Sequence, residues 1–388
     1  MGNPGPRGLR PVRRRAPRRA ITALVVALGL GCLVLADVAG APAFPTATAR
    51  AGEFPPAAAA TDTASLQAFV LAGAPDSLAD LEAHAQDIGV VYATDFECEP
   101  PGGQITGEEA VENTGAITAF ARAQQIAVMP RFNCQNGPTV HTILTEPRAR
   151  ARTLAGLARI AESPAYAGLN LDLENDTARD RSALTSFVTA LVRTLHAHGR
   201  KLTVDVDGVT HDNPAISTGL YDDRALAAVA DYVFVIAWGT HWEGSAPGPI
   251  APLSYVSAVA RYVASLPHAN RFVLGVPMYG LDWPVAEGST QRLSSPQQSP
   301  ATALQYANVL ALAHSTGATP LLDRAVDEPT FTYTRAGITH RVWYMDAQSV
   351  ADRLRIAREH GLGVGVWRLG GEDQTLWSSP TVAEGALG

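Results

Sequence analysis

The chain has 388 residues, of which 46% are hydrophobic and 17% are charged, so it is long enough for one large globular domain or for two to three small ones. Its formal net charge is −7, but the first 41 residues hold seven of the 30 basic residues and one of the 37 acidic residues. The remainder is therefore strongly acidic. That charge argues against nucleic acid or an anionic membrane as a partner, and it is compatible with a neutral polysaccharide.

The N-terminal segment has the pattern of an export signal. A basic region runs from Arg7 to Arg19, an apolar run covers residues 21–36, and small residues follow at 39–41. We expect residues 1–41 to be a signal peptide or an N-terminal anchor, and residues 42–64, rich in Ala, Pro and Thr, to be a flexible linker. This predicts a secreted or cell-surface protein that meets a membrane only through an uncleaved N-terminal segment.

After residue 65, strand-like and helix-like patterns alternate. The predicted strands cover residues 67–72, 90–98, 126–134, 167–175, 202–208, 231–238, 271–279 and 363–369. The predicted helices cover residues 77–88, 107–125, 148–161, 180–198, 225–230, 253–265 and 346–360. Eight strands separated by helices predict an α/β fold, namely a (β/α)8 barrel over residues 65–380. The chain exceeds the usual barrel length of about 250 residues mainly at residues 284–344, where we expect a small α+β insertion between strand 7 and helix 7.

The fourth predicted strand carries an unusual polar face. Leucines alternate with polar residues, which are Asn170, Asp172 and Glu174. In a barrel the leucines must face the helices, so the polar side chains point into the interior. Glu174 then lies at the carboxyl end of the strand, where barrel active sites are built. Close, buried carboxyls raise one another's pKa, and a carboxylic acid that stays protonated near neutral pH can act as a general acid. The alternative is an edge strand whose polar face meets water.

The neighbouring strands supply further inward side chains. Asp205 and Asp207 point inward from the fifth strand, either as part of a site or as a buried polar network. Aromatic residues end the sixth, seventh and eighth strands at Trp238, Tyr279 and Trp367. An acid between aromatic walls has the chemistry of a sugar site, because aromatic faces stack on the apolar faces of pyranose rings.

In their order and spacing, these motifs resemble glycoside hydrolase family 18, the chitinase-like family. That family is marked by Asp-x-x-Asp-x-Asp-x-Glu on barrel strand four, and residues 168–174 match its second half, with Asn170 in place of the middle Asp. Further matches cover residues 248–253, 275–280, 342–344 and 365–367. The chain is most similar to the branch that includes bacterial spore-cortex-lytic N-acetylglucosaminidases.

The resemblance implies a retaining hydrolysis without an enzyme nucleophile, in which the 2-acetamido oxygen of the substrate attacks the anomeric carbon. It implies that Glu174 is the acid and base and that Asp172 holds the acetamido nitrogen. It also implies that Trp367 floors the subsite and that Tyr279 lines it. We add Asn170, Asp207 and Trp238 as candidate substrate-binding residues. The implied substrate is a polysaccharide containing N-acetylglucosamine, cleaved at β-1,4 bonds in peptidoglycan or chitin, and no cofactor is implied.

One departure from the family pattern weakens the prediction of activity. Strand six of the family usually carries Met-x-Tyr-Asp or Met-x-Tyr-Glu, whereas this chain has Trp238 and Gly239 at the Tyr and acidic positions. Asp207, His241 and Glu97 are candidates to compensate. The second hypothesis is therefore a lectin-like barrel that binds carbohydrate without turnover. A third is an unrelated barrel hydrolase that uses Asp205 or Asp207 as nucleophile.

Two cysteines lie outside the N-terminal segment, Cys98 and Cys134. They follow adjacent predicted strands at the same barrel end, within bridging range, and an exported chain meets an oxidising compartment. We expect a disulfide between them, the alternative being two buried free thiols. The chain has no His-Glu-x-x-His or Cys-x-x-Cys motif, so we predict no metal site.

Overall fold

The computed structural model describes residues 65–93, 96–107, 114–213, 219–285 and 301–383. The predicted signal segment 1–41 and linker 42–64 lie outside these residues, so both remain predictions. Within the described ranges, no helix is long and apolar enough to cross a bilayer.

Eight parallel strand positions form a closed barrel, as the pairings between the strands show. Two positions are each built from two short strands, namely β2 (Ile88–Ala93) with β3 (Phe96–Glu99), and β5 (Ala127–Val128) with β6 (Arg131–Cys134). The other six are β1 (Leu66–Val70), β7 (Gly168–Leu173), β8 (Lys201–Asp207), β9 (Tyr232–Ile236), β10 (Phe272–Pro277) and β16 (Gly363–Trp367). The ring closes because β16 pairs with β1, β2 pairs with β5, and β3 pairs with β6. The predicted barrel is confirmed.

Helices cover the outside of the barrel, as expected for parallel strands that are buried on both faces. The α-helices of this shell are α1 (Pro75–Ala83), α2 (Thr114–Ala123), α3 (Gly137–Thr145), α4 (Pro147–Ala161), α5 (Arg181–Ala197), α6 (Asp223–Val229), α7 (Leu253–Ala264), α9 (Ala347–Glu359) and α10 (Pro380–Ala383). Short 3-10 turns lie at Ala85–Asp87, Ala178–Asp180, Ala269–Arg271 and Gln374–Ser378. The strand leucines Leu169, Leu171 and Leu173 pack in the main core with this shell.

The barrel interior has its own small apolar core, made by inward side chains. Its members are Phe69, Val90, Tyr92, Met129, Phe234 and Val273. Phe234 meets Phe69 edge to face, with ring centroids 5.1 Å apart. A ring at this position would clash with any side chain at residue 275 or 365, and both of these positions are glycine. Through Tyr92, whose hydroxyl lies 3.0 Å from the Thr203 hydroxyl on β8, this apolar core meets the polar side chains of the barrel interior.

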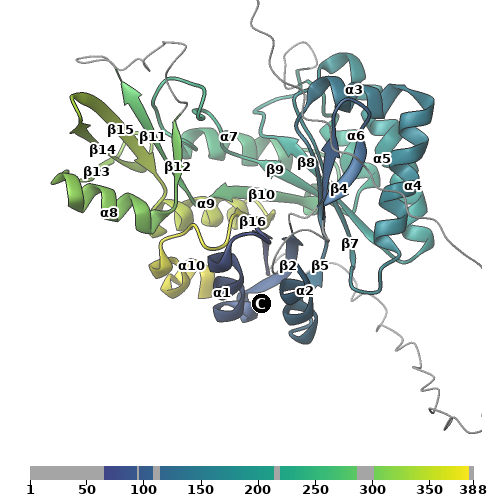
Figure 1. The fold of residues 1–388 in the computed structure, drawn as a ribbon, viewed down its shortest axis with the longest axis horizontal. Coiled ribbons are helices and arrows are strands. Elements are labelled where there is room, and N and C mark those ends of the chain that lie inside the picture. The colour runs from purple at the N-terminus through teal and green to yellow at the C-terminus, as the bar shows by residue number, and fades with distance from the viewer. Residues whose placement is uncertain (1–64, 94–95, 108–113, 214–218, 286–300, 384–388) are drawn as a thin grey trace, which may run out of the picture. The chain divides into compact units, whose positions relative to one another are not determined.

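The segment between β10 and α9 forms a second, antiparallel sheet at one side of the barrel (Figure 1). Its strands are β11 (Gly280–Val285), β12 (Thr302–Leu304), β13 (Leu321–Asp323), β14 (Glu328–Arg335) and β15 (Ile338–Tyr344), and α8 (Tyr306–Thr316) packs on it. We placed the start of the insertion at residue 284, whereas the sheet begins at Gly280 with β11. Residues 286–300 are not described.

Several boundaries differ from the sequence-based predictions. The predicted strand 126–134 is interrupted at Met129 and Pro130, because a proline lacks the N–H that continuous pairing needs. Helix α3 was not predicted. It forms because Asn136 caps its first turn by accepting a hydrogen bond from the Thr139 N–H, and because Pro138 fits the start of a helix. The antiparallel β4 (Gln104–Gly107), which pairs with β3, was also not predicted.

Candidate active site

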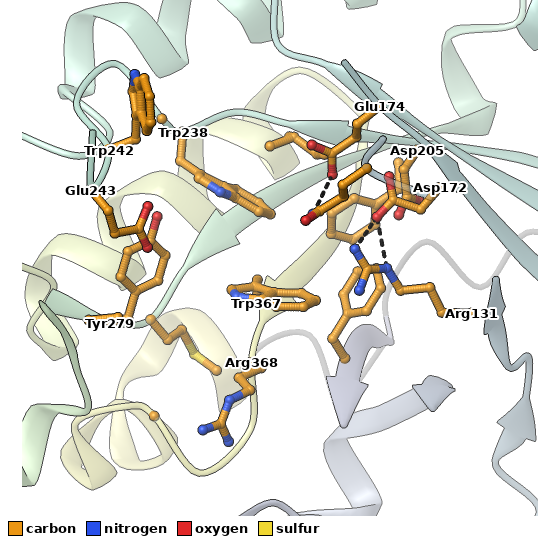
Figure 2. A pocket seen from close by; sticks show the side chains of 18 of the residues that line it. Arg131, Asp172, Glu174, Asp205, Trp238, Trp242, Glu243, Tyr279, Trp367 and Arg368 are labelled. Atoms are coloured by element: carbon orange, nitrogen blue, oxygen red, sulfur yellow. Dashed lines mark hydrogen bonds and ion pairs between the residues drawn. The ribbon is translucent and has the colours of Figure 1, made fainter. Parts of the chain in front are cut away.

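A cavity of about 400 Å³ opens where the barrel strands end (Figure 2). Four of the acids that line it come from β7 and β8 and from the ends of these strands: Asp172, Glu174, Asp205 and Asp207. A fifth, Glu243, belongs to the loop after β9. Aromatic side chains face them, namely Trp238 from the segment after β9, Trp367 from the end of β16 and Tyr279 from the segment after β10. Six of the seven residues predicted for catalysis or substrate binding therefore meet in one cavity.

Glu174 is partly buried at the end of β7. Burial, reinforced by the negative charge of Asp172, raises its pKa to about 8, against the opposing effects of Arg131 and of a hydrogen bond from Gln135. The Gln135 Nε2 donates to Glu174 Oε1 at 3.2 Å. A carboxyl with this pKa is largely protonated at neutral pH, which is the state that a general acid needs.

Asp172 is 2% exposed and is held by Arg131 from the neighbouring strand β6. The Arg131 Nε donates to Asp172 Oδ2 at 2.8 Å, and the Nη2 of the same guanidinium forms an ion pair with that oxygen. Among the described residues, no donor reaches Asp172 Oδ1, which is also buried. The Glu174 carboxyl also interacts with the Asp172 side chain, and this contact helps to raise the pKa of Glu174.

Asn170 does not line the cavity. It is fully buried in the barrel interior, where its Nδ2 donates to Asp205 Oδ1 at 2.6 Å. An aspartate at this position could not donate that bond without taking up a proton, and burial already raises the pKa of Asp205 well above its usual range. Asn170 therefore sits where it supports Asp205, and its predicted contact with substrate stays a prediction.

Asp207 lines the cavity at the end of β8. Burial raises its pKa to about 6, with a smaller contribution from the charge of Asp172. Next to it, Tyr255 donates a hydrogen bond to the Gly208 carbonyl at 2.6 Å. The site therefore contains a second acid that titrates near neutral pH.

The aromatic wall is anchored through the apolar core of the barrel. Trp367 lies 5.0 Å from Phe69 between ring centroids, and the Arg131 guanidinium lies 5.1 Å from the centroid of the Trp367 ring. Trp238 meets Phe234 edge to face at 6.3 Å. Tyr279 lines the cavity beside Glu243 (Figure 2). These contacts fix the rings, so the wall is formed without a ligand.

The loop after β9 departs from the family pattern, as predicted at Trp238 and Gly239. Gly239 has a left-handed φ of 82°, and its N–H donates to the Ile250 carbonyl at 2.9 Å. His241, a candidate to compensate for the missing acid, bonds to the Pro249 carbonyl at 2.7 Å through Nδ1. The loop instead presents Trp242, which is 57% exposed and lines the cavity.

A family model for glycosyl hydrolases family 18 matches residues 64–372. The chain belongs to this family. It is 30% identical over 234 residues to YdhD of Bacillus subtilis (strain 168), which its name describes as a sporulation-specific glycosylase, and the match covers 59% of this chain and 53% of YdhD. It is 26% identical over 237 residues to the cortical fragment-lytic enzyme of the same organism, covering 59% of this chain and 52% of that protein. The chain thus spans about half the length of these two curated relatives.

Solved structures of family 18 proteins share the fold. The chitinase of Chromobacterium violaceum ATCC 12472 superposes with a TM-score of 0.70 at 26% identity, over 83% of this chain and 98% of that one. The spore cortex-lytic enzyme SleL of Bacillus cereus superposes with a TM-score of 0.71 at 21% identity, over 83% and 74% of the two chains, and supports the fold alone. Both the recognition of family 18 from motifs and the barrel prediction are therefore confirmed.

The predicted disulfide is present in this family 18 domain. Cys98 on β3 and Cys134 on β6 are bonded, with Cα atoms 5.1 Å apart. Gln135, which donates to Glu174, comes directly after Cys134, and the Glu174 N–H donates to the Cys134 carbonyl at 2.9 Å. The disulfide thus lies at the base of the segment that contacts the candidate acid.

One group of potential metal ligands occurs among the described residues, at His141, Asp176 and Asp180. Asp180 Oδ2 lies 2.6 Å from His141 Nδ1 and 3.3 Å from Arg179 Nε, and it pairs with both side chains. Arg179 already supplies a positive charge to these acids, so the arrangement reads as a hydrogen-bonded network. The prediction that the protein has no metal site stays a prediction.

Sequence reasoning missed Arg131 and Gln135 on the side of the acids, and Trp242, Glu243 and Arg368 on the opposite side of the cavity. A signal for Arg131 was present. It is a lone arginine in a predicted barrel strand, two residues before Asn133, and this alternation indicates a polar inward face. Trp242 and Glu243 lie in the loop after β9, which follows no periodicity, so nothing in the pattern placed them at the cavity.

Proposed function

We propose that this chain is an exported glycosidase that cleaves β-1,4 bonds at N-acetylglucosamine residues of peptidoglycan or chitin. The observation that carries the proposal is the Asp172–Glu174 pair. One carboxyl is held by an arginine and the other has a pKa raised to about 8, in a cavity walled by tryptophan and tyrosine. Membership in family 18 and the names of relatives that act on chitin or spore cortex support the same substrate class.

The proposed reaction is retaining and assisted by the substrate. Glu174 donates its proton to the glycosidic oxygen as the bond to the anomeric carbon breaks, and the 2-acetamido oxygen of the substrate attacks that carbon to form an oxazolinium ion. Asp172 accepts the acetamido N–H and stabilises the positive charge. Glu174, now a carboxylate, removes a proton from the water that opens the oxazolinium ring. Each proton lost is regained within the cycle, so the reaction consumes only water.

Burial supports these roles. Asp172 Oδ1 is buried and receives no bond from a described donor, so it is available to accept an N–H. Trp367 would floor the sugar subsite, and Tyr279 would line it. Trp238 would offer its indole N–H in place of a tyrosine hydroxyl, with Asp207 and Asn170 as further candidate contacts.

Export would take the protein to a secreted or cell-surface location, through the predicted segment 1–41. Its partner would be a polysaccharide containing N-acetylglucosamine, with no role for nucleic acid and no cofactor. Contact with a membrane would come only through an uncleaved N-terminal segment.

A second candidate function is carbohydrate binding without turnover. Gly239 favours it, since this residue has no carboxylate at the place where the family usually has an acid. The retained Glu174 favours the enzyme.

The test uses the full chain with chitin oligosaccharides and with purified peptidoglycan, and mass spectrometry to detect new reducing ends. Glu174→Gln, which keeps the size of the side chain, should lose about 10²–10⁴-fold in rate, as expected when a general acid is removed. The matched control is Glu162→Gln, at an exposed position on the helix shell. Binding without cleavage by the parent would favour the lectin, and cleavage that survives Glu174→Gln would overturn the assignment of Glu174.

A further inference from the structure

Arg131 is a buried cation that lines the candidate site beside Asp172. It is 7% exposed, and it reaches across from β6 to β7 (Figure 2). Its Nε and Nη2 both bind one oxygen of Asp172, Oδ2, and the same Nη2 donates to Asn133 Oδ1 at 3.2 Å. Both donors therefore meet a single carboxylate oxygen, and the second oxygen of Asp172 is left for other partners.

The guanidinium is fixed from its other sides as well. Its carbon lies 5.1 Å from the Trp367 ring centroid and 5.8 Å from that of Phe69. Asn133, which accepts from Arg131, in turn donates to both carboxylate oxygens of Glu97 at 3.2 Å. The guanidinium is therefore held by the Trp367 ring and by the hydrogen bonds that run through Asn133 to Glu97, so Arg131 keeps one position relative to Asp172.

The charges around Asp172 are otherwise negative or neutral. The titratable groups that act on this cluster are Arg131 on β6, Glu174 at the end of β7, Asp205 and Asp207 on β8, and Tyr221 in the segment between β8 and α6. The other described cation that lines the cavity is Arg368, and its Nη1 donates to Ser77 Oγ and to the Leu369 carbonyl. Arg131 is thus the cation in contact with the acids.

We propose that Arg131 is a positioning residue for hydrolysis: it keeps Asp172 as a carboxylate and so leaves the proton of the Asp172–Glu174 pair on Glu174. Without a cation at Oδ2, two adjacent buried carboxyls would share one proton, and Asp172 would hold it for part of the time. In each molecule in which Asp172 holds the proton, Asp172 no longer offers a carboxylate to the acetamido N–H. Glu174 then also lacks the proton that the leaving oxygen needs. The inference rests on the proposed function only where it predicts an effect of Arg131 on the rate of hydrolysis.

The kinetic test compares Arg131→Gln, which keeps amide donors but loses the charge, with Arg131→Lys, which keeps the charge. The control is Arg150→Gln, a half-buried arginine on α4 that packs over Phe187 and does not line the cavity. Arg131→Gln should lower kcat more than it raises KM, and should move the acid limb of the pH profile up by about 1–3 units, the size of effect that an adjacent arginine has on an aspartate. Arg131→Lys should restore the position of the acid limb.

A merely structural role predicts a different result. The Gln and Lys variants would then lose activity in proportion to their loss of thermal stability, and both would keep the pH profile of the parent. That result would overturn the proposal.

A second readout does not depend on activity. Carboxyl carbons of ¹³C-labelled aspartate are followed by NMR between about pH 5 and 8, and Asp172 is assigned from the signal missing in Asp172→Asn. Its chemical shift should change only slightly in the parent and in Arg131→Lys, as the neighbouring Asp207 and Glu174 titrate. In Arg131→Gln it should change as much as in a carboxyl that takes up a proton, because the two carboxyls then share their proton. An Asp172 signal that behaves alike in the parent and in Arg131→Gln would contradict the proposal.

These outcomes separate the inference from the proposed function. A parent that cleaves nothing but shows the expected NMR behaviour would refute the glycosidase and leave the role of Arg131 in place. If Arg131→Gln does not fold, the double variant Arg131→Gln/Asp172→Asn decides. If the double variant folds, the unpaired charge of Asp172 caused the misfolding of Arg131→Gln, as the proposal expects. If it does not fold, Arg131 is needed for packing, and the proposal is overturned.

Discussion

At the scale of single residues, the site depends on a difference in protonation between two neighbouring acids in the barrel interior. Asp172 and Glu174 lie two positions apart on β7 and its end, so they share a face and repel each other when both are charged. Arg131 binds one of them, and burial keeps the proton on the other. This asymmetry gives two identical functional groups two different chemical roles.

The first prediction concerns the pH dependence of cleavage. Glu174 must be protonated to act as an acid, and its pKa is raised to about 8. We therefore expect kcat/KM on a chitin oligosaccharide to be maintained below this pH and to fall above it, with a midpoint near 8. Initial rates measured across the pH range check this. An alkaline limb more than about two units lower would contradict the assignment of Glu174 as the acid.

The second prediction concerns stability. A carboxyl whose pKa is higher in the folded than in the unfolded protein favours folding below the unfolded pKa, and this contribution is lost as the pH rises through the folded pKa of about 8. Glu174→Gln should therefore be more stable than the parent at pH 9, by roughly 1–3 kcal/mol, and similar to it near pH 4. Denaturant unfolding at both pH values measures this, and Glu162→Gln should show no such pH-dependent gain.

At the scale of elements, the cavity wall formed by the loop after β9 is attached to the second sheet. Glu328 at the start of β14 accepts hydrogen bonds from the Ile250 and Ala251 N–H groups, each at 2.7 Å. Arg353 on α9 donates to the Ala251 carbonyl at 2.8 Å and to Glu328 at 3.4 Å. Both charged side chains are fully buried. The antiparallel sheet therefore holds the loop that presents Trp238 and the exposed Trp242.

The third prediction tests this attachment. Glu328→Ala should lower the free energy of unfolding by about 2–5 kcal/mol, because it leaves the buried Ile250 and Ala251 N–H groups without an acceptor. It also removes one of the two carboxylates that pair with Arg353, the other being that of Asp327. Glu328→Gln should cost less, since it keeps an acceptor for one of the two N–H groups. Chemical denaturation measures both changes, and a loss in Glu328→Ala no larger than that of an exposed control such as Glu359→Ala would refute the attachment.

The fourth prediction concerns the disulfide between β3 and β6. Its two cysteines are 36 residues apart in the sequence, so the bond restricts the unfolded chain. Reduction, or the double variant Cys98→Ser/Cys134→Ser, should lower the free energy of unfolding by about 2–4 kcal/mol. Thermal unfolding with and without reductant measures this. The Ser variant provides the control, because reductant should not change its Tm.

At the scale of the whole molecule, charge bears on the choice between chitin and peptidoglycan. The chain outside residues 1–41 carries 36 acidic and 23 basic residues, and acids outnumber arginines in the cavity lining. Chitin is uncharged, whereas peptidoglycan carries carboxylates on its stem peptides. An acidic protein repels an anionic polymer over a distance that salt shortens, to about 10 Å at 0.1 M.

The fifth prediction follows from this repulsion. Raising the salt concentration from low to physiological should increase kcat/KM on peptidoglycan and leave kcat/KM on chitin oligosaccharides nearly unchanged. Parallel assays of both substrates over a salt series measure the difference. Cleavage of peptidoglycan that slows as salt is added would mean that the protein attracts this substrate, contrary to the prediction.

The sequence by itself determined the barrel, its fourth strand and the aromatic ends of three later strands. These features repeat with the period of a strand, and each strand of a barrel has one inward and one outward face, so alternation along the chain already places a side chain. The order of motifs determined the family, and the motifs at 168–174, 275–280 and 365–367 lie along barrel strands or at their ends.

Only the tertiary structure decided how the acids are paired. Arg131 and Asp172 are 41 positions apart, and their contact depends on the register between β6 and β7, in which Arg131 lies opposite Asn170. It also decided that Asn170 supports Asp205 beneath the cavity, and that a loop with no periodic pattern brings Trp242 to its wall. Register and loop conformation arise from the packing of the whole barrel, and no local stretch of sequence contains that information.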